Sequence, residues 1–597
     1  MQRKTIHGND ISFVNPKNYG KNKEIKSWKF NKDGTILVYD LYDSKKKLNE
    51  RRFKTLNRLK YNEVLRNITN DDFKFVFNGT GIVYSNKNGK NYSLYYHKLG
   101  TNQNNDVKFS DEQFNNAKQE IEYVSFDGKY LFIAIYLNPS AKSIYYCDLS
   151  DKTGEGIKKK LQFKVLIENE FGSRYDIIDA NKNDVYLYTD NDSDFGGIVK
   201  LNVKKEKNFT ISNVVKPKNG TLIDKVVPVG ENYLVYTGYV KLQHYVFIFN
   251  KINKKNYKIT NLGTGIIKNL YGNRNSYEVF FTFANPVVPT IIYTLNLKTL
   301  SKNQFFYLEK VIKTGPKNYS KSNIRGIVVH LNSVDNVSIP ALIVLPGDIH
   351  LNGNNPLILE TYSESEGSTS TISNFSPSRY FFVKHMKGIV CYVNTRGGVY
   401  NGDEWFYNGT IDKQQHRYDD FLTYIKFLIY KNITSPKKLA IYGSGTSGVV
   451  TAYIINNHPE LVQSSIIQGT LLDLISPLNY DGLKEYKEEF GDPEYGDEFQ
   501  YLKRYSPLHN IKQPNNFIQW PSTLVKTSNN VNDSISLSIL KYMSELYTNL
   551  ESIREYQTNP VIASLINEND KKEDRFLNDT INEMVFIVET LNLTLTI

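Results

Sequence analysis

The first half of the chain repeats a pattern of two short apolar segments around a tight turn. The pattern recurs over residues 27 to 39, 73 to 85, 121 to 136, 175 to 190, 224 to 239 and 268 to 283. In each copy, aromatic and β-branched residues flank glycine, asparagine or aspartate at the turn, which predicts a β-hairpin. The copies begin about 44 to 54 residues apart, a spacing typical of β-propeller blades. We therefore expect a β-propeller with about six recognisable blades, and an irregular β-sandwich is the alternative.

The pattern changes near residue 320, where strand-like runs begin to alternate with helical ones. The runs are GIVVHL, ALIVLP, PLILETY, GIVCYVN, KLAIYG, SSIIQG and STLVKT, and the clearest helices are expected over Asp419 to Tyr430, Gly448 to Asn457, Ile535 to Leu550 and Asn578 to Leu591. This alternation predicts an α/β domain with a mainly parallel, doubly wound sheet and helices on both faces. We expect the propeller to span residues 1 to 318 and the α/β domain residues 319 to 597, with the boundary between 315 and 322.

Composition and charge exclude several classes of function. The net charge of +12 is spread thinly over 597 residues, and its short lysine clusters come with no aromatic–basic RNA motif or zinc finger, so nucleic acid is not an expected partner. No apolar run approaches the length of a membrane-spanning helix, and the N-terminus lacks a signal peptide. Cys147 and Cys391 lie in apolar contexts far apart in the sequence, which favours buried, reduced thiols and a cytoplasmic protein.

One glycine-rich turn lies between an apolar strand and a helix, in KLAIYGSGTSGVVTAYIINN (438 to 457). The pattern Gly443-x-Gly445-x-x-Gly448 fits a dinucleotide-binding turn. That interpretation requires an acidic residue at the end of the next strand, which instead ends in Ile466, Ile467 and Gln468. The alternative is a nucleophile elbow, in which small residues permit a strained turn between strand and helix.

Longer segments decide between these interpretations. Six longer blocks, in this order along the chain, are similar to segments of one known family: LYYHKLGTNQNNDV, YYCDL, SRYFFVKHMKGIVCYVNTRGGVYNGDEW, DKQQHRYDDF, TSPKKLAIYG and YLKRYSPLHNIKQP. Along nearly its whole length the chain resembles the prolyl oligopeptidase family. The resemblance implies a propeller that caps an α/β-hydrolase domain, with an active site in the cavity between them.

The same resemblance implies that the catalytic triad is degenerate. The family's elbow reads G-G-S-N-G-G, which places Gly445 in the position of the nucleophile. Neither Ser444 nor Ser447 is a good substitute, because bulkier residues would flank either serine in the tight turn. Val531 falls in the position of the acid and Asn567 in that of the histidine. No histidine follows His509 in the chain, so no base can follow the acid in the order serine, aspartate, histidine.

The binding groups differ as well. Glu364 occupies the position of the tyrosine that donates to the oxyanion, where a carboxylate would repel the developing negative charge. Tyr486 aligns with the aromatic residue that stacks on the substrate proline, Gly367 replaces another aromatic residue of the pocket, and Asp533 replaces a substrate-binding arginine. The histidines show no zinc-binding spacing, and we expect neither a metal nor a cofactor.

The family's N-terminal helical segment and opening blade have no counterpart in the sequence, which predicts six blades or a ring left open at the position of a seventh. The leading hypothesis is a catalytically inactive, monomeric pseudopeptidase that retains a peptide or protein ligand in the inter-domain cavity. One alternative is an active serine endopeptidase that cleaves short peptides after proline with displaced residues. The other alternative is an interaction scaffold in which the propeller binds the partner.

Overall fold

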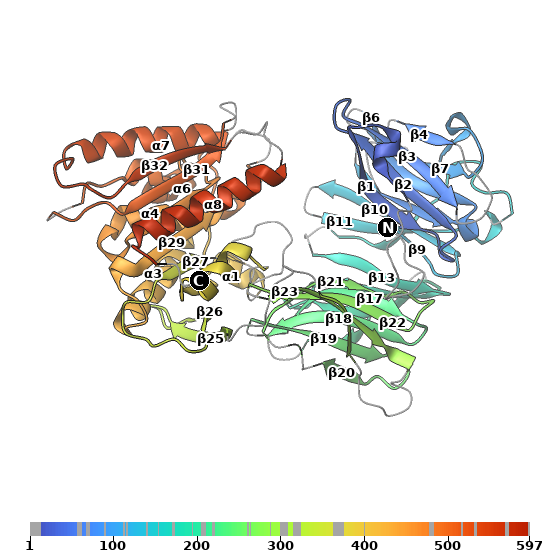
Figure 1. Cartoon of the computed structure of the whole chain (residues 1–597). Helices are drawn as coiled ribbons and strands as arrows, with labels where there is room; N and C mark the ends of the chain where they lie inside the picture. Colours follow the sequence, from blue (N-terminus) through green and yellow to red (C-terminus); the bar gives the residue numbers. More distant parts are fainter. Residues whose placement is uncertain are drawn as a thin grey trace.

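The N-terminal half of the molecule is a propeller of six four-stranded antiparallel sheets (Figure 1). The computed structural model describes residues 14–594 except for 56–62, 67, 69–71, 89–90, 111–113, 115–116, 139–140, 153, 170–172, 194, 205–210, 218–220, 241, 260–261, 263, 287, 299–307, 314–323, 362–374, 399, 401, 477–482, 515–516, 530–533 and 567–571. A short 3-10 helix, η1 (Pro16–Tyr19), precedes the first blade.

Within each blade the strands pair in chain order. Blade 1 comprises β1 (Lys23–Phe30), β2 (Ile36–Asp43), β3 (Leu48–Thr55) and β4 (Val64–Arg66). Blade 2 comprises β5 (Phe73–Val76), β6 (Gly81–Asn88), β7 (Asn91–Lys98) and β8 (Val107–Lys108). Blade 3 comprises β9 (Lys118–Val124), β10 (Tyr130–Asn138), β11 (Ala141–Asp148) and β12 (Lys164–Ile167). Blade 4 comprises β13 (Tyr175–Asn181), β14 (Asp184–Thr189), β15 (Gly197–Asn202) and β16 (Ser212–Val215). Blade 5 comprises β17 (Leu222–Val229), β18 (Tyr233–Val240), β19 (Gln243–Asn250) and β20 (Asn256–Ile259). Blade 6 comprises β21 (Ile266–Tyr271), β22 (Glu278–Asn285), β23 (Val288–Asn296) and β24 (Leu308–Lys313).

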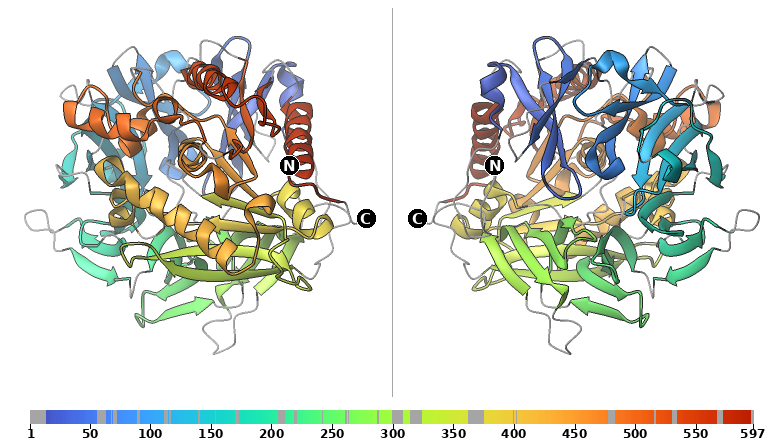
Figure 2. Two further views of the ribbon diagram at one scale, coloured as in Figure 1. Left: turned by 90° about the vertical axis from the view of Figure 1, so that its left-hand side faces the viewer. Right: turned by 90° about the vertical axis from the view of Figure 1, so that its right-hand side faces the viewer.

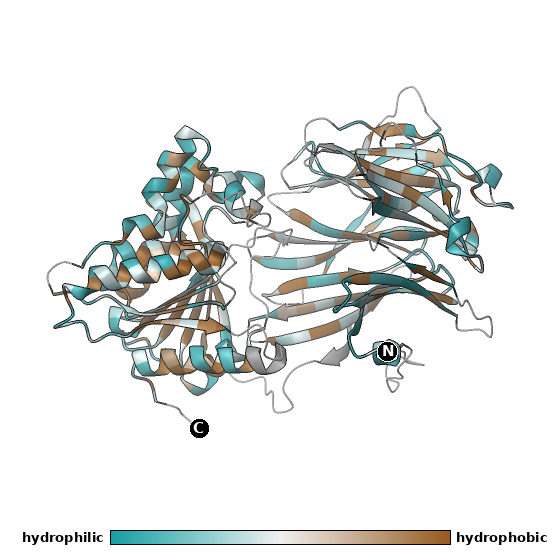
Figure 3. Cartoon of the chain, turned by 90° about the horizontal axis from the view of Figure 1, so that it is seen from above, coloured by the Kyte–Doolittle hydropathy of each residue, from teal (hydrophilic) through white to brown (hydrophobic). Residues whose placement is uncertain are grey.

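The C-terminal half is built on one eight-stranded sheet of order β25-β26-β28-β27-β29-β30-β31-β32. Its strands are β25 (Ile324–Asn332), β26 (Ser338–Pro346), β27 (Leu357–Thr361), β28 (Ile389–Val393), β29 (Leu439–Ser444), β30 (Ser464–Gln468), β31 (Ser522–Ser528) and β32 (Val561–Ile566). From β28 to β32 every neighbouring pair is parallel, and β25 and β26 add an antiparallel edge. Figure 3 shows that the strands of this sheet are mainly hydrophobic and that the helices beside it are amphipathic.

Helices cover both faces of the sheet. They are α1 (Pro377–His385), α2 (Asp403–Tyr407), α3 (Gln414–Tyr430), α4 (Thr446–Asn457), α5 (Lys484–Phe490), α6 (Gly496–Tyr505), α7 (Ser534–Glu551) and α8 (Lys572–Thr590), and the short helix η10 (Pro507–Asn510) follows α6. Helices α3, α4 and α7 pack on one face, whereas α1 and α8 pack on the other. Figure 2 shows α1 and α8 on one side of the domain.

One hydrophobic cluster joins the two domains. Leu242, Ile266 and Ala284 of blades 5 and 6 belong to the same buried cluster as Tyr380 of α1 and Phe586 of α8. Ile266 begins β21 and Ala284 lies near the end of β22, so both are remote from the turn between these two strands. The α/β domain therefore packs against the end of the propeller opposite to the turns between the first and second strands of the blades.

Those turns meet at the far end of the propeller, in a group of residues that we call the distal cluster: Lys32, Phe126, Asp179, Arg274 and Asn275. Lys32 donates to the carbonyl oxygen of Phe126 (3.0 Å) and lies over its ring. Asn275 donates to the carbonyl oxygen of Lys32 (3.0 Å), and Arg274 donates to the buried carboxylate of Asp179 (2.5 Å). The distal cluster thus links blades 1, 3, 4 and 6.

The predicted architecture is confirmed. Each predicted hairpin corresponds to the first two strands of a blade, and the four predicted helices correspond to α3, α4, α7 and α8. Cys147 and Cys391 are buried free thiols, as expected. The expected boundary at residues 315 to 322 lies outside the described residues and stays a prediction. Within the described part of the chain, no helix is both long enough and apolar enough to cross a bilayer.

Candidate functional site

The turn between β29 and α4 has the backbone of a nucleophile elbow. β29 lies between β27 and β30 in the sheet, and α4 begins one residue after Gly445. Gly445 has φ 58° and ψ −130°, a conformation that residues with a side chain adopt only under strain. Its amide donates to the carbonyl oxygen of Gln468 in β30 (3.0 Å), and among the described residues no atom lies within 4 Å of a Cβ built at this position. The turn therefore points its apex into open space.

The two other glycines of this turn are explained by packing. A Cβ at Gly443 would overlap Thr451 of α4, and one at Gly448 would overlap Thr470, which follows β30. Both glycines let α4 approach the sheet closely. Hence the spacing that resembles a dinucleotide-binding turn is a consequence of helix–sheet contact.

The two neighbouring serines differ in their surroundings. The hydroxyl of Ser447 accepts a hydrogen bond from the amide of Ser444 (2.9 Å) and donates to the carbonyl oxygen of the same residue (2.8 Å). Ser447 is only 5% exposed, so its oxygen is bound within the turn. Ser444 is exposed at the end of β29 and does not occupy the apex.

The strands that precede the other predicted site positions in the sequence end at the same edge of the sheet as β29. Because β27, β29, β31 and β32 run parallel, their carboxyl ends meet at one edge. Glu364 and Gly367 follow β27, Val531 and Asp533 follow β31, and Asn567 follows β32. All five lie outside the described residues, and their assigned roles stay predictions.

Tyr486, the predicted substrate-stacking residue, lies on α5 and is 5% exposed. Its hydroxyl accepts a hydrogen bond from the amide of Leu471 (3.1 Å), and its ring stacks on Phe490. It packs in a buried cluster with Val449 of α4. The structure therefore places Tyr486 in the packing around the elbow helix.

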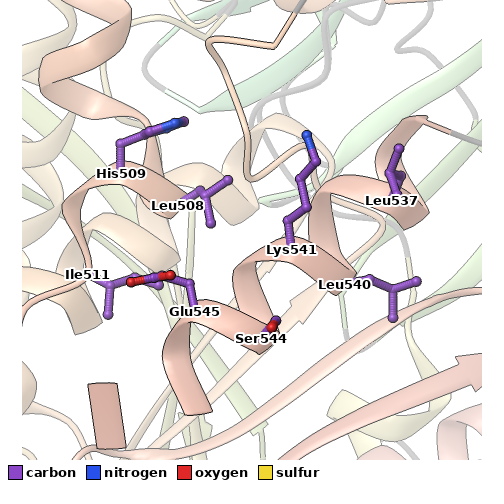
Figure 4. Close-up of a pocket in the computed structure, with 8 residues that line it drawn as sticks. All are labelled: Leu508, His509, Ile511, Leu537, Leu540, Lys541, Ser544 and Glu545. Carbon is purple, nitrogen blue, oxygen red and sulfur yellow. The ribbon is translucent and has the colours of Figure 1, made fainter. Parts of the chain in front are cut away.

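The last histidine of the chain lies away from the elbow. His509 contacts the hydroxyl of Ser506 (2.9 Å) and lines a groove of about 710 Å³ between η10 and α7, which Figure 4 shows. Asn456, near the C-terminal end of α4, donates to the carbonyl oxygen of Pro507 in η10 (2.9 Å). Gly445 lies at the opposite end of α4, roughly 16 Å from that contact along the helix axis.

A buried network of charges, which sequence analysis missed, lies beside the elbow. Arg379 of α1 donates to Glu360 of β27 and to Glu583 of α8 (2.6 Å). Lys526 of β31, 1% exposed, lies 3.4 Å from Glu583. The guanidinium of Arg379 is 4.8 Å from the ring centre of Tyr442, three residues before Gly445.

Burial opposes ionisation of both carboxyl groups in this network, but the outcome differs between them. Burial raises the pKa of Glu360. The pKa of Glu583 is lowered in spite of its burial, because Arg379 and Lys526 both stabilise the carboxylate. The network therefore fixes α8 against the sheet by charge as well as by apolar contact.

Comparisons with known proteins agree with this architecture. Residues 3–305 match the family model of the prolyl oligopeptidase N-terminal beta-propeller domain, and residues 373–533 match that of the prolyl oligopeptidase family. The chain is 25% identical over 568 residues to the prolyl endopeptidase of Elizabethkingia meningoseptica, covering 92% of this chain and 76% of that protein. It is also 25% identical over 471 residues to the prolyl endopeptidase of Dictyostelium discoideum, covering 76% and 60% of the two chains.

Among solved structures, prolyl oligopeptidase B from Galerina marginata, bound to a 25mer macrocyclization substrate, superposes with a TM-score of 0.81 at 18% identity. The match covers 97% of this chain and 82% of the other. The order of the domains, the elbow after β29 and the matched family models all lead to one assignment: the chain belongs to the prolyl oligopeptidase family.

Proposed function

We propose that this protein is a non-hydrolytic member of its family that binds peptides in the cavity between the propeller and the α/β domain. Gly445 carries the proposal, because an elbow with glycine at its apex offers no oxygen to attack a carbonyl carbon. A peptide ligand is supported by the relative from Galerina marginata, which was captured with a 25mer substrate. We further propose that the protein is monomeric and cytoplasmic.

The remaining catalytic positions support the same proposal. Val531 cannot orient an imidazole, Asn567 cannot accept a proton, and Glu364 would repel an oxyanion. In addition, the hydroxyl of Ser447 already makes two hydrogen bonds to the backbone of Ser444. Losing the triad of a serine peptidase costs about six orders of magnitude in turnover.

The test of inactivity is covalent labelling. The purified chain is incubated with a fluorophosphonate probe and, separately, with a fluorogenic peptide cleaved after proline. We expect no labelling and no cleavage, also in Gly445→Ser, because that variant restores the nucleophile without a base. Stoichiometric labelling that is lost in Ser444→Ala or Ser447→Ala would establish the competing function, an active endopeptidase with a displaced serine.

Binding is tested separately, by fluorescence anisotropy with a labelled proline-containing peptide of about eight residues, roughly the span of one extended strand. Gly445→Phe places a ring in the open space at the elbow and should weaken binding at least tenfold. Gly128→Phe is the matched control, because Gly128 also has positive φ and open space but lies in a turn at the distal end of the propeller. Equal affinities in both variants would argue against binding at the elbow.

A further inference from the structure

The distal end of the propeller carries a pocket that is separate from the proposed peptide site. It has a volume of about 330 Å³ and is lined by residues of blades 4, 5 and 6. These residues come from the β13–β14, β17–β18 and β21–β22 turns and from the ends of β15 and β19; strands β13, β19 and β21 are labelled in Figure 1. The pocket therefore lies at the end of the propeller opposite to the α/β domain.

The base of the pocket is a buried group of three charges. Arg274 and Lys251 both donate to Oδ2 of Asp179, over 2.5 and 3.1 Å. The side chains of Arg274 and Lys251 are 8% and 10% exposed, and that of Asp179 is fully buried. Two cations thus share one oxygen of a single carboxylate, so this group carries an excess of one positive charge.

The same group has unused hydrogen-bonding atoms. Nε of Arg274 and Oδ1 of Asp179 are buried, and neither has a hydrogen-bond partner among the residues that the structure describes. Buried polar atoms are normally paired, because leaving them unpaired is costly. Burial lowers the pKa of Lys251 and the charge of Arg274 acts in the same direction, whereas Asp179 opposes both. An anion in the pocket would therefore stabilise both cations and supply an acceptor for Nε of Arg274.

The acidic residues around the pocket do not cancel the excess charge. Asp184, which lines the pocket, is paired with Lys200 (2.8 Å). The other two charged lining residues, Lys182 and Glu231, are exposed and opposite in sign. The charged groups that line the pocket or pair with its lining groups are therefore four cations and three anions: Lys182, Lys200, Lys251 and Arg274; Asp179, Asp184 and Glu231.

The charges next to this set are balanced. Asp127 accepts a hydrogen bond from the backbone amide of Lys182 (3.0 Å) and adds one negative charge. Lys32 adds one positive charge, because it lies over the ring of Phe126, which Arg274 also contacts. The region as a whole remains positive, and its most deeply buried charges are the cations at the base. An anion is therefore the ligand that the pocket favours.

We propose that this pocket binds the phosphate group of a small phosphomonoester. Its three lining cations come from three separate segments: Lys182 from the β13–β14 turn, Lys251 from the residue after β19 and Arg274 from the β21–β22 turn. The three terminal oxygens of a phosphomonoester allow each segment to donate to a different oxygen, whereas a carboxylate offers two oxygens in one plane. Lysine and arginine are the side chains that most often bind phosphate.

The rest of the lining favours a ligand whose remainder is polar and uncharged. The volume of about 330 Å³ is near the lower limit of small-ligand sites, roughly 300–1,000 Å³, so the ligand has few atoms beyond the phosphate. Asparagine side chains line the pocket beside Tyr186, whose ring centre is 5.0 Å from Nζ of Lys251. Amide groups and the carboxylate of Glu231 bind hydroxyl groups, and Glu231 disfavours a second negative charge. A polyol phosphate combines these properties.

Isothermal titration calorimetry of the full chain tests the ligand class. The probes are glycerol phosphate, inorganic phosphate and acetate, at an ionic strength held constant with sodium chloride. We expect glycerol phosphate to bind one site per chain at submillimolar concentration. Inorganic phosphate should bind more weakly than the ester, and acetate at least tenfold more weakly, because it offers only two oxygens and one charge.

Substitutions test the site. Lys251→Met removes one donor and one charge and should weaken binding of glycerol phosphate at least tenfold. Lys142→Met is the matched control: Lys142 is 13% exposed and lies between Glu122 (3.2 Å) and Asp176 (2.5 Å), but it is near the β10–β11 turn at the other end of the propeller. Asp179→Asn keeps the shape of the base and removes its negative charge, so it should strengthen binding at least tenfold. A purely structural ion pair would not produce that gain.

The proposal is wrong if unsubstituted protein does not bind glycerol phosphate at millimolar concentration, or if acetate binds equally well. It is also wrong if inorganic phosphate binds more tightly than the ester, since free phosphate would then be the ligand. Equal losses in Lys251→Met and Lys142→Met, or weaker binding in a folded Asp179→Asn variant, would exclude this pocket as the site. The comparison of probes on unsubstituted protein does not depend on whether a variant folds, and none of these results depends on peptide binding at the elbow.

Discussion

Replacing Gly445 by alanine tests whether the turn after β29 is a strained elbow. The residue has φ 58° and ψ −130°, and an added Cβ would meet no atom within 4 Å in the part of the chain that the structure describes. The methyl group therefore changes the conformational energy of the backbone without creating a collision.

The expected loss of stability follows from two opposing contributions. Holding a residue with a side chain in such a conformation costs about 1–3 kcal/mol. Replacing glycine also restricts the unfolded chain, which restores about 0.4–1 kcal/mol. We expect Gly445→Ala to lower the free energy of unfolding by about 1–2 kcal/mol, which corresponds to roughly 2–8 °C in the melting temperature of a domain of this size.

Urea unfolding followed by tryptophan fluorescence measures this loss, because Trp405 and Trp520 are buried in the α/β domain. Gly496→Ala is the matched control: Gly496 also has open space around it but does not have positive φ. Alanine there, at the first residue of α6, should be neutral or stabilising by up to about 1 kcal/mol. Gly448→Ala should be worse than either, since its Cβ would overlap Thr470.

Equal stabilities of Gly445→Ala and Gly496→Ala would refute the reasoning. That result would mean that the turn adopts an ordinary backbone conformation in solution. The inference that a serine in this position would occupy an elbow would then fail as well.

Three further predictions concern other parts of the molecule. Arg379→Met leaves two buried carboxylates without their shared partner and should cost about 3–5 kcal/mol in urea unfolding, whereas Lys387→Met, which removes an exposed ion pair, should cost less than about 1 kcal/mol. Burial lowers the pKa of His244 from 6.5 to about 4; the unfolded chain therefore binds a proton that the folded chain does not, and stability should fall by up to about 3 kcal/mol as pH decreases from about 6.5 to 4. The slope of stability against pH should flatten in His244→Gln and persist in a variant of the exposed His350. Limited proteolysis should cut between residues 315 and 322 and leave a resistant C-terminal fragment of about 280 residues, and digestion throughout that fragment would contradict an independently folded α/β domain.

Local signals explain why much of the fold could be predicted. The first two strands of each blade are joined by a short turn, so the residues that pair lie close together in the sequence and their pattern predicts the hairpin. Strand β32 was not predicted, because Ser564 interrupts its apolar run and its position at the sheet edge leaves Ile562 and Leu565 exposed. An edge strand lacks the continuous apolar pattern of a strand buried on both faces.

The site was predicted unevenly for a related reason. The pattern around Gly445 is contiguous, and its strand–turn–helix setting is present in the structure. In contrast, Arg379 and Glu583 are 204 residues apart, and in the sequence each looks like an ordinary surface charge. Only the placement of α1 and α8 on the same face shows that these two charges are buried together.

That shared face has a consequence for synthesis of the protein. A ribosome that elongates by about 5–20 residues per second needs roughly 10 to 40 s to proceed from α1 to α8. Throughout this interval Val390, Ala440 and Ile466, which α8 helps to bury, lack that cover in the nascent chain. The six blades, in contrast, are complete once Lys313 has emerged. We therefore expect chaperones that bind nascent chains to engage the α/β domain late, and translation that stalls before α8 to release a folded propeller attached to an aggregation-prone sheet.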